Sequence, residues 1–273
     1  MALSIAGAVW RIADVCEARL CCKPTRTGGR FLNDQTTVVA QLAESLAGAA
    51  TAERAEQEKQ YLKSELRFIG ASVPAVRRVA RTFVADHPAL TAEDLKGLVG
   101  ALWNTHTHEL RSVGIAVLEL RSDLLRKSDV GWLKGLVDRS TTWAHVDWLA
   151  IKVVGALATR IPAVETDLDE WSAHTNFWVR RSALLANHDR LAAGQGEFER
   201  FERRAAPMLQ EREFFIRKAI GWVLRSTCKK TPWRTIGFVE RHADEMSALT
   251  FREATRALEP SQQQRLQRLR ANR

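Results

Sequence analysis

The sequence has few of the residues that build disulfide frameworks, strands or membrane spans. Its 273 residues include four cysteines and a single tyrosine, Tyr61, beside nine tryptophans. No apolar run approaches the roughly 20 residues that are needed to span a bilayer. The mildly apolar N-terminus has no basic segment before it, so we expect neither a membrane partner nor a secretory signal.

Sequence motifs for metal and cofactor binding are also missing. Cys16, Cys21 and Cys22 are clustered, Cys228 stands alone, and none of them has the spacing of a zinc site. The chain contains no phosphate-binding glycine loop, no dinucleotide-binding fingerprint and no HExxH motif. No Ser or Cys catalytic triad is evident. We therefore expect a protein that uses no metal and no cofactor.

Helical periodicity dominates the chain from Thr37 onward, and strand signals are almost absent. Proline-containing breakers separate the apolar periodic segments. Three long helices are expected near residues 143–160, 177–190 and 213–227. The expected organisation is a poorly ordered N-terminal extension over residues 1–33, a helical repeat domain over 34–260, and a basic C-terminal tail over 261–273.

Similar helical segments recur along the chain. Arg111, Asp147, Arg180 and Arg217 occupy comparable places and are separated by 36, 33 and 37 residues. Helix pairs that repeat every 35 to 40 residues are typical of α-solenoids of the HEAT type. We therefore predict an all-α fold, an α-solenoid of HEAT-like helical repeats that form a concave basic groove. The groove should be lined by Arg111, Asp147, Arg180, Arg181, Arg217 and Lys218.

Positive charge is concentrated in the C-terminal third. The formal net charge is +9. Residues 177–273 contain 20 Lys and Arg against 11 Asp and Glu, whereas residues 1–176 contain 21 of each. Most of the excess is arginine, whose guanidinium group suits bidentate contacts to phosphate. This distribution favours a polyanionic partner, above all nucleic acid.

Asp147 is the acidic exception among these basic repeat positions. An aspartate on an amphipathic helix is ordinarily solvated or salt-bridged, and that interpretation stays open. In a cationic groove a carboxylate stays ionised but repels phosphate, so binding alone does not explain it. Cleavage of an N-glycosidic bond does, because an oxocarbenium-like sugar develops that a carboxylate can stabilise, or for which it can guide water.

Two tryptophans are candidates for a receptor of positive charge. Trp143 precedes Asp147 by four residues and shares its helix face, and Trp222 follows about two repeats later. Core packing is the ordinary role of such residues. An indole face also attracts a cation by about 0.5–2 kcal/mol, and a purine alkylated at N3 or N7 is cationic.

Basic residues surround both tryptophans along the sequence. Arg180 and Arg181 open one inner helix, and Arg217, Lys218 and Arg225 lie on the next. Lys218 and Arg225 flank Trp222 on nearby turns. A solvated basic face would explain them equally well. As phosphate contacts they would position DNA without reading its sequence.

At these residues the chain resembles the AlkD-like bacterial alkylpurine DNA glycosylases, over roughly residues 51–260. The resemblance rests on four ordered pieces: Tyr61-Leu62-Lys63-Ser64 with Phe68-Ile69-Gly70 and Val73-Pro74; Leu102-Trp103-Asn104 with His108-Glu109-Leu110; Trp143 with Val146-Asp147; and Asn176-Phe177-Trp178-Val179-Arg180-Arg181 followed by Glu213-Phe214-Phe215-Ile216-Arg217-Lys218-Ala219-Ile220-Gly221-Trp222-Val223-Leu224-Arg225.

The resemblance implies a role for individual residues. Asp147 would be the catalytic carboxylate, and Trp143 and Trp222 the aromatic pair that borders the lesion. Arg181 and Arg225 would contact DNA, and Tyr61 would lie at the N-terminal end of the groove. The resemblance also implies excision without flipping the base into a tight pocket. Thr142 and Ala144 depart from the Trp-Trp-Asp pattern of the family, which points to a substrate preference of its own.

We therefore expect a monofunctional DNA repair glycosylase that excises cationic N3- or N7-alkylated purines, bulky adducts included, from duplex DNA. No lysine stands out as a Schiff-base nucleophile, so no lyase activity is expected. The protein should be a cytoplasmic monomer, associated in a bacterium with the nucleoid. Two alternatives stay open: a non-catalytic HEAT-like module that binds damaged or branched DNA, and a solenoid that binds an acidic protein.

Overall fold

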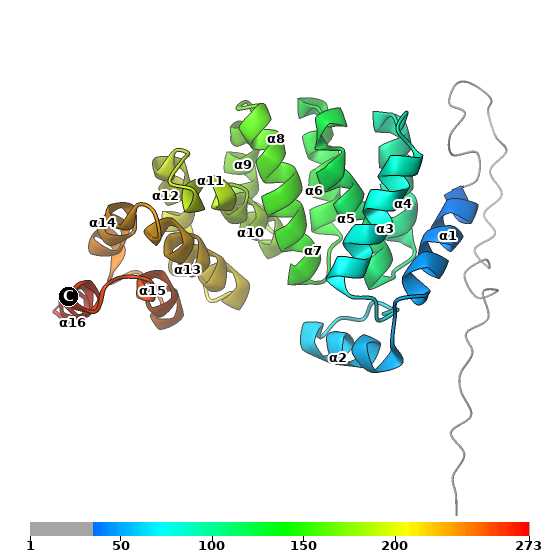
Figure 1. The fold of residues 1–273 in the computed structure, drawn as a ribbon. Helices are drawn as coiled ribbons and strands as arrows, with labels where there is room; N and C mark the ends of the chain where they lie inside the picture. Colours follow the sequence, from blue (N-terminus) through cyan, green and yellow to red (C-terminus); the bar gives the residue numbers. More distant parts are fainter. Residues whose placement is uncertain (1–34, 273) are drawn as a thin grey trace, which may run out of the picture. The chain divides into compact units, whose positions relative to one another are not determined.

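The computed structural model of the protein describes residues 35–272, which form two compact units (Figure 1). The N-terminal unit ends at Leu120 and the C-terminal unit begins at Arg121. Across residues 35–272 the secondary structure is helical, with isolated bridges but no strand. The prediction of an all-α fold is confirmed. The extension predicted over residues 1–33 lies outside the described residues.

The N-terminal unit is built around one buried helix. Every residue of α5 from His108 to Leu118 is buried, and α5 packs against α3 and α4, while α1 packs against both of these and against α5. The helices of this unit are α1 (Gln35–Ala47), α2 (Ala52–Leu62), α3 (Val73–Asp86), α4 (Ala92–Asn104) and α5 (His108–Leu120).

A buried carboxylate ties α5 to the loop before α3. The Glu109 side chain accepts hydrogen bonds from the backbone N–H groups of Ile69, Gly70 and Ala71, at 2.9, 2.6 and 3.3 Å. Gly70 has φ +93°, and a Cβ there would lie 2.1 Å from the carbonyl oxygen of Thr51. Only glycine fits this turn. Two of the motif pieces noted in the sequence therefore meet in one structural contact.

The C-terminal unit is a succession of short helices, which Figure 1 shows in green to red. Apolar residues from α10 to α16 share one buried core. Leu266 is fully buried in it, so the segment expected as a basic tail contributes a packed helix, α16. The elements are η2 (Ser122–Leu124), η3 (Lys127–Asp129), α6 (Val130–Asp138), α7 (Trp143–Trp148), η4 (Leu149–Val154), α8 (Gly155–Arg160), α9 (Val164–Ser172), α10 (Phe177–Leu185), α11 (His188–Ala192), α12 (Phe198–Ala205), η5 (Ala206–Met208), α13 (Phe214–Cys228), α14 (Pro232–His242), α15 (Ala248–Thr255) and α16 (Pro260–Ala271).

Ion pairs in this unit connect helices that belong to consecutive repeats. Their partners are separated by 34 to 40 residues in the sequence. Neighbouring helices therefore come from consecutive repeats, as the period of 35 to 40 residues predicts. The pairs are Asp147–Arg181, Asp169–Arg204, Lys218–Glu253, Glu202–Arg241 and Lys127–Asp167.

The helix expected over residues 143–160 is interrupted. After α7 the chain makes a π-helical turn, η4, before it continues as α8. At the start of α8, a Cβ on Gly155 would lie 2.3 Å from the carbonyl oxygen of Ala186 at the end of α10. Glycine therefore permits α8 and α10 to approach closely. Single π-helical turns inside helices occur often at functional sites.

Candidate functional site

The site is built on α7, whose first residue is Trp143 and which carries Asp147 one turn later. Thr142 caps the helix, because its Oγ1 accepts a hydrogen bond from the backbone N–H of Ala144 at 3.4 Å. Trp143 is half-buried, and Asp147 lies one turn later on the same face with 9% of its surface exposed. The two residues therefore share a helix face, as their spacing predicts.

Arg181 of α10 binds both oxygens of the Asp147 carboxylate. Its Nε donates to Oδ1 at 2.7 Å and its Nη2 donates to Oδ2 at 2.8 Å. The third guanidinium nitrogen, Nη1, donates to the backbone carbonyl of Phe215 on α13. Arg181 is only 3% exposed. The guanidinium therefore fixes the carboxylate in one orientation and joins α7, α10 and α13.

Burial and charge act on Asp147 in opposite directions. Burial raises the pKa of its carboxyl above the ordinary value, because the carboxylate loses water. The hydrogen bonds and positive charge of Arg181, and then the charge of His188, oppose this rise. Without Arg181 a carboxyl this deeply buried would take up a proton much more readily.

Trp222 lies on α13 against a histidine that the sequence analysis did not single out. The imidazole of His188, at the start of α11, is centred 4.7 Å from the indole. Trp222 is half-buried and packs against the core of the unit. The charge of His188 also lowers the pKa of Asp147, although less than burial raises it.

Two of the predicted DNA-binding cations share one carboxylate. Lys218 Nζ is 2.7 Å from Glu253 Oε1, and Arg225 Nη1 pairs with the other oxygen. Burial would raise the pKa of Glu253, but these cations and Arg256 outweigh it and hold the pKa below its ordinary value. Gly221 lets α15 come this close to α13, because a Cβ there would lie 2.5 Å from the Cβ of Glu253.

Two further predicted cations converge on Glu211. Arg180 donates to its carboxylate through Nε and Nη2, at 3.1 and 2.8 Å, and through Nη1 to the carbonyls of His174 and Thr175. Arg217 Nε donates to the backbone carbonyl of Glu211 at 2.6 Å. The contacts that Arg180 and Arg217 make within the protein are therefore structural, and their contact with DNA stays a prediction.

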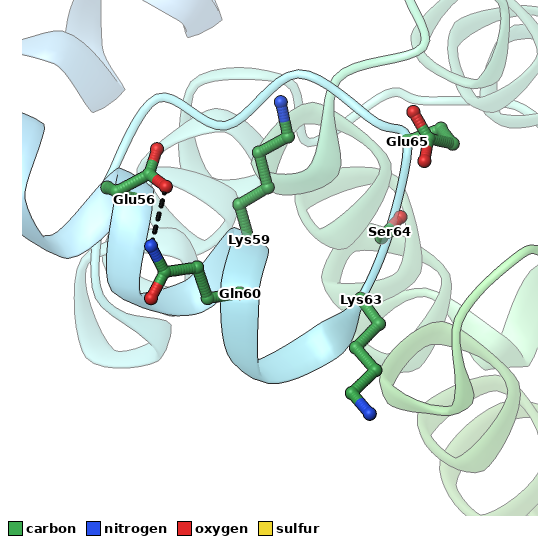
Figure 2. A pocket seen from close by; sticks show the side chains of 6 residues that line it. All are labelled: Glu56, Lys59, Gln60, Lys63, Ser64 and Glu65. Carbon is green, nitrogen blue, oxygen red and sulfur yellow. Dashed lines mark hydrogen bonds between the residues drawn. The ribbon is translucent and has the colours of Figure 1, made fainter.

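The remaining predicted positions lie in the N-terminal unit. Arg111 is 3% exposed and its Nε donates to the carbonyl of Trp103 at 2.9 Å, so the prediction that it lines a groove is wrong. The aligned position faces the interior of its unit. Tyr61, in contrast, is 72% exposed at the end of α2. An open hollow nearby is lined by Glu56, Lys59, Gln60, Lys63, Ser64 and Glu65 (Figure 2).

Sequence reasoning missed the acidic partners and the histidine. Glu253 lies 35 residues after Lys218, and Glu211 lies 31 residues after Arg180. A search for opposite charges about one repeat apart would have found both of them. His188 had no such signal, because its contact with Trp222 depends on how α11 packs against α13.

Within residues 35–272 no cluster of three or more His, Cys, Asp or Glu has the arrangement of a metal site. None of the helices in that range is long and apolar enough to cross a membrane.

Comparison with known proteins identifies the relationship of this chain. The fold is similar to that of an Enterococcus faecalis protein described as a predicted DNA alkylation repair enzyme, with 22% identity, a TM-score of 0.70, and coverage of 77% of this chain and 97% of the other. It is also similar to AlkD2 from Streptococcus mutans, with 18% identity, a TM-score of 0.54, and coverage of 87% and 98%. No curated protein matches the chain significantly. The sequence matches the DNA alkylation repair enzyme family over residues 42–258, and the chain therefore belongs to that family.

Proposed function

We propose that the protein is a monofunctional DNA glycosylase that removes cationic, alkylated purines from duplex DNA. The observation that carries the proposal is the Asp147–Arg181 pair, in which a carboxylate is held in a fixed orientation one turn from Trp143. Fixed charges that face a developing cation are an effective form of catalysis, since no reorganisation is needed during the reaction.

The reaction breaks the bond between C1′ and the purine nitrogen. The bonding electrons leave with the base, which neutralises its positive charge, and the sugar becomes oxocarbenium-like. Water then adds to C1′ and releases a proton, leaving an abasic site. Asp147 stabilises the sugar cation in this step, and Arg181 is a positioning residue that keeps the carboxylate ionised and oriented.

Pairing with Arg181 also removes the objection that a carboxylate repels DNA. The two opposite charges largely cancel at the distance of a phosphate, while the carboxylate still acts on a cation in close contact. About 13% of the Asp147 side chain remains accessible, against 4% for Arg181. Of the two side chains, that of Asp147 is thus the more accessible.

The two indoles suit a lesion that is held at the surface of the protein. Trp143 and Trp222 are each half-buried, so part of each ring is anchored and part is accessible. An accessible indole face attracts the cationic base or sugar by about 0.5–2 kcal/mol. We propose that the lesion is bordered by these rings without entering a tight pocket, which would accommodate small and bulky adducts on a monomeric enzyme.

The test is release of 7-methylguanine or 3-methyladenine from methylated duplex DNA. We expect Asp147→Asn to lower the single-turnover rate constant by about 10²–10³-fold. Asp169→Asn is the matched control, because Asp169 also pairs with an arginine of the next repeat, Arg204, at 2.7 Å. Equal release by wild type and Asp147→Asn would refute the role of Asp147. Salt-dependent DNA binding by a wild type that releases no base would favour the non-catalytic module instead.

A further inference from the structure

His188 lies at the point where α11 meets α13. Its Nε2 is 3.0 Å from Oγ of Ser226, and its Nδ1 is 3.0 Å from Oδ1 of Asp189. Asp189 in turn pairs with Lys152 of the π-helical turn η4, at 2.5 Å. The ring is thus held at both nitrogens while its face contacts the indole of Trp222, 4.7 Å away and tilted by 51°.

The order Asp189, His188, Ser226 is that of a hydrolase triad, but the surroundings favour another role. Ser226 is 8% exposed and lies inside α13, one turn after Trp222. A nucleophile buried within a helix cannot reach a bulky substrate. The contacts with Asp189 and Ser226 instead fix the imidazole, since both of its nitrogens have a partner. A ring fixed in this way is a rigid support for the indole that it contacts.

We propose that His188 is a positioning residue of the excision reaction, which fixes the orientation of the Trp222 indole. The inference rests on the proposed glycosylase function and extends it to a residue outside the predicted catalytic set. It assigns His188 two separable effects, one through the ring and one through the charge.

The charge of His188 acts within a defined set of neighbours. Asp189 from its own helix and Lys152 from η4 form a compensated pair on one side. The charge of His188 also acts on Asp147 of α7, which is compensated by Arg181 of α10. The positive charge of the imidazolium lowers the pKa of Asp147. Removal of His188 should therefore let the pKa of Asp147 rise, so that the catalytic carboxylate is protonated at a higher pH than in the wild type.

The experiment is single-turnover release of 7-methylguanine from methylated duplex DNA, measured between about pH 4.5 and 8. His188→Gln removes both the ring and the charge, whereas His188→Phe keeps an aromatic ring but removes the charge and the hydrogen bonds to Ser226 and Asp189. The matched control is His242→Gln, because His242 also has both nitrogens bonded, to Glu245 and Glu202, and contacts an aromatic ring, that of Phe238, at 4.8 Å.

We expect His188→Gln to lower the rate constant about tenfold at neutral pH with little change in DNA affinity, since misplacing a reacting group mainly affects the chemical step. The acidic limb of its pH profile should move to higher pH. His188→Phe should recover the rate only in part, because its ring packs against Trp222 without the two hydrogen bonds that fix the imidazole, and it should keep the displaced limb. His242→Gln should match the wild type.

Other outcomes would overturn the inference. A rate and an acidic limb in His188→Gln equal to those in His242→Gln would show that the histidine only packs. A lower rate with an unmoved limb in both His188 variants would remove the electrostatic half of the proposal. If the wild type itself releases no base, the proposed function fails and the inference falls with it, which differs visibly from loss in the His188 variants alone.

Discussion

At Gly155 we expect Gly→Ala to destabilise the protein, although the same substitution inside a helix ordinarily stabilises it. Gly155 begins α8, and a Cβ there would lie 2.3 Å from the carbonyl oxygen of Ala186. Gly135 lies within α6 of the same unit, and a Cβ on it would meet nothing within 4 Å. Both are helical glycines, so Gly→Ala changes the same intrinsic preference at both positions.

The magnitudes follow from two opposing terms. Alanine is favoured over glycine inside a helix by about 1 kcal/mol, and this gain applies to both sites. Overpacking costs about 1–3 kcal/mol, and the upper end applies at Gly155 because the atom that must move is a main-chain oxygen. We therefore expect Gly135→Ala to stabilise the protein by about 0.5–1 kcal/mol and Gly155→Ala to destabilise it by about 2 kcal/mol.

Urea denaturation followed by circular dichroism measures both values, and an unchanged m-value would show that stability alone has changed. In thermal unfolding, about 2–4 °C per kcal/mol corresponds to a Tm roughly 4–8 °C lower for Gly155→Ala. The methyl group would also push α10 away from α8, so base release should fall in this variant. A Gly155→Ala protein as stable as Gly135→Ala would refute the close approach of the two helices.

Three further predictions concern buried charges. Arg181→Met should lower the unfolding free energy by about 3–5 kcal/mol, measured by urea denaturation, because Asp147 would keep a buried, uncompensated charge. Arg181→Lys should restore stability only in part, since an ammonium cannot bind both oxygens in a fixed plane. Burial, and then the charge of Arg111, lower the pKa of His108 to about 4. As the pH falls from about 6.5 to about 4, the unfolded chain binds a proton at this histidine before the folded chain does, so about 3 kcal/mol of stability should be lost. His108→Phe should abolish that part of the pH dependence. Glu253→Gln frees the two cations it pairs with, so duplex DNA should bind more tightly at low salt and the affinity should fall more steeply with salt, by about one unit of slope; unchanged binding isotherms would contradict this.

The architecture was largely predictable because it depends on patterns that repeat along the sequence. Helical periodicity and the spacing of about 35 residues between comparable positions led to the all-α repeat fold. The partner of each residue was less predictable: Arg111 aligns with Asp147 by spacing and both are buried, but Arg111 bonds the Trp103 carbonyl whereas Asp147 pairs with Arg181. Spacing defines which residues share a place in the repeat, but local packing decides which partner each of them meets.

The candidate site was predictable where its residues share a helix and obscure where they do not. Trp143 and Asp147 lie one turn apart on the same face of α7, so the helical period alone brings them together. The net charge did not reveal which cations are paired. Glu253 forms ion pairs with two of the expected phosphate ligands, and Glu211 accepts hydrogen bonds from two others. A count of positive charges therefore overstates how many of them are free to meet phosphate.

The same type of contact holds the fold together and forms the site, and its surroundings separate the two uses. Asp169–Arg204 and Asp147–Arg181 each join helices from consecutive repeats through a nearly buried guanidinium. The Asp169 side chain is 47% exposed, so water screens it and it gains little from the pair. Asp147 is far less exposed, and its desolvation costs more than an ordinary structural pair requires. A repeat that tolerates this cost one turn from Trp143 gains an oriented charge, which structural packing alone does not explain.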